Sequence, residues 1–144
     1  MHYVLIDLVP ALLTWEGRDS VAQPEAREGA LQMVDDLYND FRLAAVADGD
    51  RPASAVREAL ERLDMAVFFD SIGTSSVFGP TVTPRVVRRI TSAIGGAGHS
   101  IVVTARTGLA DALHHAGIPV VSAGGDVGEV GKAVRRLAYG RVNP

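Results

Sequence analysis

The chain contains no cysteine, and this absence excludes several kinds of chemistry at once. Without thiols there is no disulfide framework, no thiolate metal site and no cysteine nucleophile. Lysine is almost as scarce, because Lys132 is the only one in the sequence. A chain without cysteine suits the reducing interior of a cell, so we expect a cytoplasmic protein.

The sequence also lacks a basic excess and any long apolar run. Charged residues make up 22% of the 144 residues and the formal net charge is -3, a balance that disfavours nucleic-acid binding. No apolar stretch approaches the roughly 20 residues that a membrane-spanning helix needs. The first residues, MHYVLIDLV, have neither the basic start nor the cleavage site of a signal peptide. We therefore expect neither a nucleic-acid partner nor a membrane partner.

Hydrophobic residues are plentiful, at 47% of the chain, and they occur in short bursts that alternate with segments of helical periodicity. This alternation is typical of a parallel sheet covered by helices on both faces. The bursts predict strands at residues 3–6, 43–47, 70–74, 101–103 and 119–121. Because the length fits one domain, we predict a single three-layer, Rossmann-like α/β domain over residues 1–144, with a mainly parallel sheet of about five strands.

The segments between the bursts predict amphipathic helices, because apolar residues recur there at three- and four-residue spacing. These helices are expected within residues 30–41, 56–63, 84–93, 109–116 and 130–137. Gly95-Gly96 and Gly117 stand where two of them should stop, since glycine readily takes the left-handed conformation of a helix end. Asp126 and Glu129 have the spacing of a capping box before the last helix, with Asp in place of Ser or Thr.

Three segments stand at related places in this predicted fold. Val4–Val9 is an apolar strand followed by Asp7, Phe68–Ile72 is followed by Gly79 and a helix that begins with proline, and Val102–Gly117 holds a strand and a helix. In this order they resemble the first motif, the lysine motif and the final acidic motif of the haloacid dehalogenase (HAD) superfamily. The resemblance covers nearly the whole chain. It implies a HAD-like domain without a cap domain, because only one helix fits between Asp7 and the second strand.

The resemblance also implies a chemistry. In that superfamily a first Asp attacks phosphorus, and a second Asp two positions later works as acid and base. A hydroxyl residue and a lysine hold the phosphoryl oxygens, and further acidic residues complete a Mg²⁺ site, since this ion prefers hard oxygen ligands. All of these groups lie at the carboxyl ends of strands, where open α/β sheets bind their ligands.

Carried over to this sequence, Asp7 stands at the position of the nucleophile, and most of its partners are replaced. The acid/base position, the hydroxyl position and the two metal-acid positions fall on Val9, Ala47, Thr104 and Leu109. The lysine motif, residues 78–84, contains no lysine. Each missing group removes several kcal/mol of transition-state stabilisation, and about 1.4 kcal/mol is worth tenfold in rate. We therefore interpret Asp7 as a vestigial nucleophile or as an acceptor for loop amides, and we expect no cofactor.

Two further candidates for binding follow from position. Asp48 comes directly after the second strand and Thr104 ends the fourth, so both should line a ligand crevice together with Asp7. Asp48 can equally be explained by the turn that it forms. Trp15 lies in the irregular stretch Ala11–Gln23 and is a candidate partner contact, because tryptophan is enriched at interface hot spots. The alternative is that Trp15 packs against its own domain.

Three functions remain open from the sequence. The first is a HAD-like pseudoenzyme that binds a partner protein or a small ligand. The second is a divergent Mg²⁺-dependent phosphatase with Asp7 as nucleophile and with Asp48, Asp50 or Asp111 as replacement metal ligands. The third is a structural or regulatory subunit, working with a protein partner or as a homo-oligomer, since a fold does not fix a function.

Overall fold

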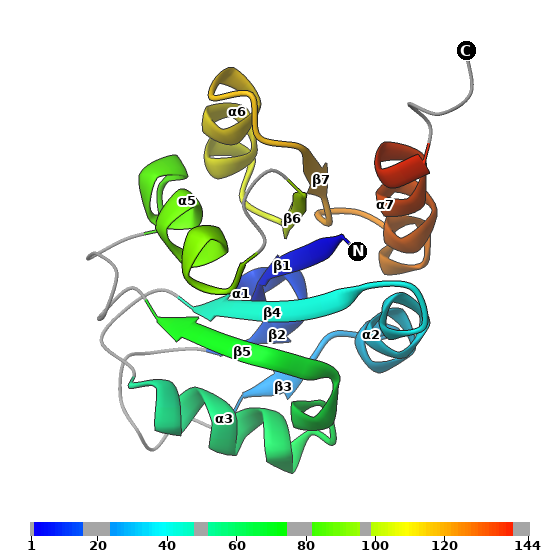
Figure 1. The fold of residues 1–144 in the computed structure, drawn as a ribbon. Coiled ribbons are helices and arrows are strands. Elements are labelled where there is room, and N and C mark those ends of the chain that lie inside the picture. Colours follow the sequence, from blue (N-terminus) through cyan, green and yellow to red (C-terminus); the bar gives the residue numbers. More distant parts are fainter. Residues whose placement is uncertain (1, 16–23, 48–51, 75–81, 96–98, 140–144) are drawn as a thin grey trace.

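The computed structural model describes residues 2–15, 24–47, 52–74, 82–95 and 99–139. Five parallel strands form one central sheet in the order β5-β4-β1-β6-β7 (Figure 1). The strands are β1 Tyr3–Asp7, β4 Arg42–Ala47, β5 Phe69–Thr74, β6 Ser100–Thr104 and β7 Val120–Ser122. The predicted three-layer α/β fold and its five strands are confirmed.

The two central strands are buried on both faces, as their unbroken apolar sequences predict. Every residue from Val4 to Asp7 is buried in β1, and every residue from Leu43 to Ala47 is buried in β4. Successive side chains point to opposite faces of the sheet. Ile6 therefore lies in a larger hydrophobic cluster, the main core, and Leu5 lies in a second core on the other face.

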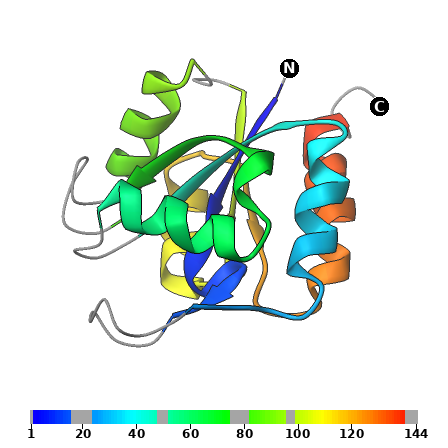
Figure 2. The ribbon, with the colours of Figure 1, turned by 90° about the horizontal axis from the view of Figure 1, so that it is seen from below.

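Helices of the expected amphipathic kind cover both faces (Figure 2). On the main core lie α2 Ala30–Tyr38, α3 Ala53–Arg62 and α7 Val130–Tyr139, and on the second core lie α5 Pro84–Ala93 and α6 Thr107–His115. None of the described helices is long and apolar enough to cross a membrane.

Helices α2 and α7 run side by side over the main core (Figures 1 and 2). A Cβ at Gly131 would lie 2.5 Å from Asp36 Oδ2, so a larger residue there would displace this carboxylate. Arg135 joins the two helices by donating from Nη1 to Asp36 Oδ2 and from Nε to Asp40 Oδ2, both at 2.8 Å. The hydrogen bond with Asp36 raises the pKa of Arg135 above its usual value.

The helix ends follow the sequence at two of three predicted places. Gly95 and Gly117 have φ of +80° and +76°, as a left-handed helix stop requires. The prediction of a capping box at Asp126 is wrong. Its Oδ1 accepts a hydrogen bond from the Gly128 N–H at 2.9 Å, and the Glu129 N–H donates to the main-chain oxygen of Asp126 at 3.1 Å. A 3-10 turn, η2 Val127–Glu129, precedes α7, and the Asp126 side chain accepts from the second N–H of this turn.

The segment after β1 is more regular than its sequence predicts. A single helical turn, α1 Leu8–Ala11, follows β1 directly, and β2 Leu13–Thr14 pairs antiparallel with β3 Glu25–Ala26. Leu8 and Leu12, four residues apart, are completely buried, and this burial holds the turn against the sheet. A second short turn, η1 Ala66–Phe68, leads into β5.

Candidate functional site

Asp7 lies at the carboxyl end of β1, the middle strand of the sheet. The parallel register pairs Ile6 of β1 with Val103 of β6. The next residues on the two strands, Asp7 and Thr104, are therefore neighbours at the edge where α/β folds bind ligands. Both side chains are completely buried.

The Asp7 carboxylate is held by a hydroxyl and a guanidinium. Thr104 Oγ1 donates to Asp7 Oδ2 at 2.8 Å. Arg106 donates from Nε to Oδ2 and from Nη2 to Oδ1, each at 2.8 Å, so its guanidinium binds both carboxylate oxygens. The Arg106 N–H also donates to Thr104 Oγ1 at 3.1 Å, which orients the hydroxyl toward Asp7.

This geometry explains how a carboxylate can be completely buried at the centre of the fold. An isolated buried charge is very costly, and a two-point contact with arginine is the pairing that best compensates it. The Arg106 side chain remains 32% exposed, so the guanidinium covers Asp7 from the solvent side. In the described part of the chain, no buried side-chain nitrogen or oxygen lacks a hydrogen-bond partner.

The arrangement is poorly suited to nucleophilic attack by Asp7. Both oxygens of Asp7 accept from Arg106, so a phosphorus atom would have to approach a carboxylate whose solvent side carries a guanidinium. The residues at the other family positions are core residues. Ala47 and Leu109 are buried, and Val9 packs against the main core.

The structure brings together only some of the predicted site residues. Thr104 does lie against Asp7, but its hydroxyl is already bonded there. Asp48 and Asp50 lie outside the described residues, as do positions 78–81 of the lysine motif. Asp111 is exposed on α6.

Trp15, the predicted partner contact, is partly buried and packs against the main core. Its packing agrees with the alternative that it belongs to its own domain, and its role in partner binding stays a prediction. Lys132 lies on α7, where its Nζ is 3.6 Å from Glu129 Oε1 and both side chains are largely exposed.

Sequence reasoning missed two arginines. Arg106 follows β6 by two residues, and its meaning depends on β6 lying next to β1, which no local pattern reveals. Arg27 donates from Nη1 to the main-chain oxygens of Ala11 and Ala123, at 3.1 and 2.9 Å. It thereby ties the turn after β1 to the segment after β7.

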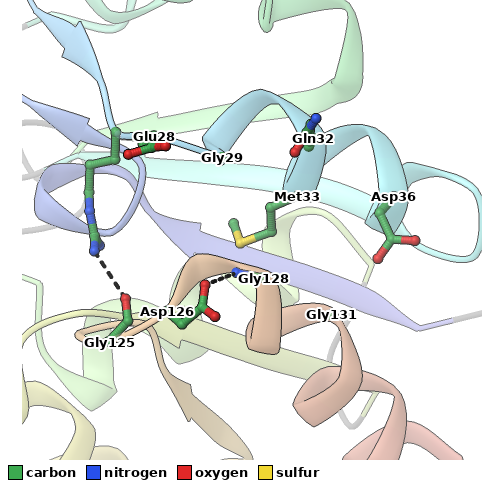
Figure 3. Close-up of a pocket in the computed structure, with 10 residues that line it drawn as sticks. Glu28, Gly29, Gln32, Met33, Asp36, Gly125, Asp126, Gly128 and Gly131 are labelled. Atoms are coloured by element: carbon green, nitrogen blue, oxygen red, sulfur yellow. Dashed lines mark hydrogen bonds between the residues drawn. The ribbon is translucent and has the colours of Figure 1, made fainter.

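A pocket of about 790 Å³ lies beside Arg27, between the start of α2 and the start of α7 (Figure 3). Its charged side chains are Arg27, Glu28, Asp36 and Asp126. The Arg27 guanidinium is engaged by main-chain oxygens, including that of Gly125 at 3.3 Å. Carboxylates therefore dominate the pocket, which disfavours a phosphate ester as its ligand.

Comparison with known proteins rests on structure, because no family model and no curated protein matches the sequence. A predicted phosphatase from Clostridium acetobutylicum superposes with a TM-score of 0.63 at 15% identity, covering 94% of this chain and 98% of its own. A HAD-like family hydrolase from Streptococcus pneumoniae gives 0.58 at 17% identity over 69% of this chain. A candidate HAD-hydrolase from Bacillus subtilis, bound to magnesium, gives 0.57 at 18% identity over 67%. The chain spans 46% and 43% of the lengths of these last two proteins.

The magnesium in the Bacillus protein raises the question of whether such an ion fits here. Mg²⁺ needs several hard oxygen ligands in octahedral geometry. Beside Asp7 stands a guanidinium instead of further carboxylates, and the described residues contain no group of three His, Cys, Asp or Glu side chains that could hold a metal ion. The described residues around Asp7 therefore do not fit Mg²⁺.

The superpositions cover between 67% and 94% of this chain. At identities of 15–18% the likeness concerns the fold. The chain has the fold of the HAD-like hydrolases.

Proposed function

We propose that this chain is a HAD-like pseudoenzyme that binds a partner protein or a small ligand and does not transfer phosphoryl groups. The observation that supports this proposal is the two-point contact of Arg106 with Asp7. Arginine occupies the solvent side of the carboxylate, where a substrate phosphorus would have to approach.

The energetic argument concerns what Asp7 would need to become a nucleophile. Arg106 would have to leave, and removing one partner of a buried ion pair costs about 3–5 kcal/mol. At about 1.4 kcal/mol per tenfold change, the state in which Arg106 has left Asp7 would be at least ~100-fold less populated than the paired state. Its chemistry would then proceed with valine at the position of the general acid. A structural role is simpler for Asp7, in which the ion pair with Arg106 neutralises its carboxylate at the centre of the fold.

A phosphatase assay tests the proposal. Wild-type protein is incubated with Mg²⁺ and p-nitrophenyl phosphate or acetyl phosphate, beside Asp7→Asn and the matched control Glu58→Gln, which changes an exposed carboxylate on α3. We expect all three proteins to give the same background rate. Circular dichroism verifies that Asp7→Asn remains folded. Turnover that Asp7→Asn abolishes and Glu58→Gln preserves would disprove the pseudoenzyme.

One observation favours a second candidate, a divergent Mg²⁺-dependent phosphatase that uses Asp7 as nucleophile. The predicted phosphatase from Clostridium acetobutylicum matches this chain over nearly the full length of both proteins. The same assay separates the two candidates, because this one requires turnover that depends on both Mg²⁺ and Asp7. A structural or regulatory subunit, the third possibility, would form a stable complex or homo-oligomer in size-exclusion chromatography with light scattering.

A further inference from the structure

Helix α2 carries two exposed apolar side chains besides the face that it buries. Residues 31, 35 and 38 follow one another at four- and three-residue spacing, so Leu31, Asp35 and Tyr38 form one stripe on the helix surface. The side chains of Ala30, Met33, Val34 and Leu37 are buried elsewhere on the helix. Leu31 is 43% exposed and Tyr38 is 49% exposed. An amphipathic helix would normally carry polar residues at such positions.

The short turn η1 lies against this stripe. The ring of Phe68 meets that of Tyr38 edge-on, with centroids 5.4 Å apart, and its neighbour Val67 is 80% exposed. A groove of about 390 Å³ lies here, and we call it the α2–η1 groove. Its lining residues are Leu31, Gln32, Asp35, Asp64 and Phe68.

Two carboxylates border this apolar groove, and no cation among the described residues pairs with them. No hydrogen bond or ion pair joins the carboxylate of Asp35 or Asp64 to another residue that the structure describes. Asp36 and Asp40 differ from this pair, because Arg135 binds both of their carboxylates. The α2–η1 groove therefore combines exposed apolar side chains with uncompensated negative charge, and it is complementary to a cationic, apolar partner.

Asp64 is also an unfavourable choice for the backbone at its position. It follows the end of α3 with φ of +60°, where glycine is the usual residue. The Asp64 N–H donates to the Glu61 main-chain oxygen at 3.1 Å, and the Met65 N–H donates to that of Leu60 at 2.8 Å. A negative charge next to a helix C-terminus is unfavourable as well. Asp64 therefore carries a local cost in stability that glycine would avoid.

We propose that the α2–η1 groove docks a short basic, amphipathic segment of a partner protein. A large apolar side chain of the segment packs on Leu31 and Phe68, and a lysine or arginine lies between Asp35 and Asp64. This proposal rests on the proposed function, since it names the surface through which a binding protein would act. The negative charge of the groove disfavours nucleic acids and anionic membranes as occupants.

A peptide selection tests the groove. A phage library of short random peptides is panned on the wild-type protein, with counter-selection on the double variant Asp35→Asn/Asp64→Asn. We expect the enriched peptides to combine Lys or Arg with large apolar residues. In fluorescence anisotropy such a peptide should bind the double variant, and also Leu31→Ser, about tenfold more weakly. Asp111→Asn, on the opposite face of the sheet, should bind it as the wild type does, and added salt should weaken binding.

Four outcomes would overturn the groove as a peptide site. They are no enrichment, enrichment of acidic peptides, equal binding by the wild type and both groove variants, and binding that Asp111→Asn weakens. A dimer in light scattering that Leu31→Ser dissolves would assign the groove to a second copy of the chain. Sedimentation with phosphatidylglycerol vesicles that depends on Leu31 would assign it to a lipid surface.

The failures of the two proposals are distinguishable. Turnover that depends on Asp7 would overturn the proposed function, whatever the peptides do, because Asp7 lies in the sheet and takes no part in the α2–η1 groove. If the peptide selection fails and the phosphatase assay shows no turnover, only the docking role of the α2–η1 groove is overturned.

Discussion

At the scale of single residues, the contact between Arg106 and Asp7 is the feature with the largest consequences. A completely buried carboxylate is stable only with a partner, and Arg106 provides that partner by donating to both oxygens. Under the proposed function, the bonds that stabilise Asp7 are also those that would keep its oxygens from phosphorus.

Replacing Arg106 with alanine should lower the free energy of unfolding by about 3 kcal/mol, the lower end of the range for buried pairs, since the arginine is partly exposed. The measurement is urea denaturation at neutral pH. Arg136→Ala, on the exposed side of α7, is the matched control and should change stability by less than about 0.5 kcal/mol. The double variant Asp7→Asn/Arg106→Ala should recover part of the loss. A loss no larger than that of the control would contradict the role given to the pair.

Asp64→Gly should stabilise the protein by about 1 kcal/mol, because glycine removes both the left-handed strain and the charge at the helix end. Asp64→Asn removes the charge alone and should stabilise by only a few tenths of that amount. Urea denaturation of both variants checks this order. If Asp64→Gly is destabilising, the carboxylate supports the fold and the argument that it serves docking loses one of its premises.

The sequence was informative about Asp7 and uninformative about its partner. The apolar run before Asp7 was enough to place that carboxylate at the end of a buried strand. Thr104 was likewise placed at the end of β6. Arg106 could not be recognised, because its side chain acts across two strands that are far apart in the sequence, and the strand order that brings them together is a property of the whole sheet.

At the scale of elements, the ends of helices show what local sequence can determine. Thr83 and Pro84 predict a helix start, and α5 begins there with Thr83 Oγ1 accepting from the Val86 N–H at 3.2 Å. The pairing of β2 with β3 could not be predicted in the same way. Each strand has only two residues, and the pairing joins positions 11 to 13 residues apart.

Thr83→Ala should lower the free energy of unfolding by about 1 kcal/mol, because the Val86 N–H loses its hydrogen-bond acceptor at the start of α5. Thr83→Ser keeps the hydroxyl and should remain within about 0.5 kcal/mol of the wild type. Thermal denaturation followed by circular dichroism is the measurement. Equal losses for both variants would mean that the threonine methyl group, and not the cap, supports the helix.

At the scale of the whole molecule, the two cores share one sheet, since β1 and β4 contribute side chains to both. Loss of either core would expose the sheet, so we expect one cooperative unfolding transition. Trp15 packs on the main core and reports it by fluorescence, whereas circular dichroism reports helices on both faces. The two probes should give the same urea midpoint. Separate midpoints would show that the two cores unfold independently.

The overall architecture was the most predictable property, because the alternation of apolar bursts and amphipathic segments reflects burial on both faces of a parallel sheet. The positions of the five strands of the central sheet and of five helices followed from that alternation. The function was less predictable. The function depends on which side chains meet at the end of β1. The replaced family residues indicate only which catalytic groups are missing.

The central claim is that Arg106 makes Asp7 unavailable to phosphorus, and one measurement tests it directly. Beryllofluoride with Mg²⁺ mimics a phosphoryl group and attaches to the reactive aspartate of phosphoryl-transfer enzymes, where ¹⁹F NMR detects the bound species. We predict that wild-type protein shows only the signals of free fluoride complexes. A protein-bound signal that Asp7→Asn removes and Glu58→Gln retains would contradict the claim and make Asp7 an active nucleophile.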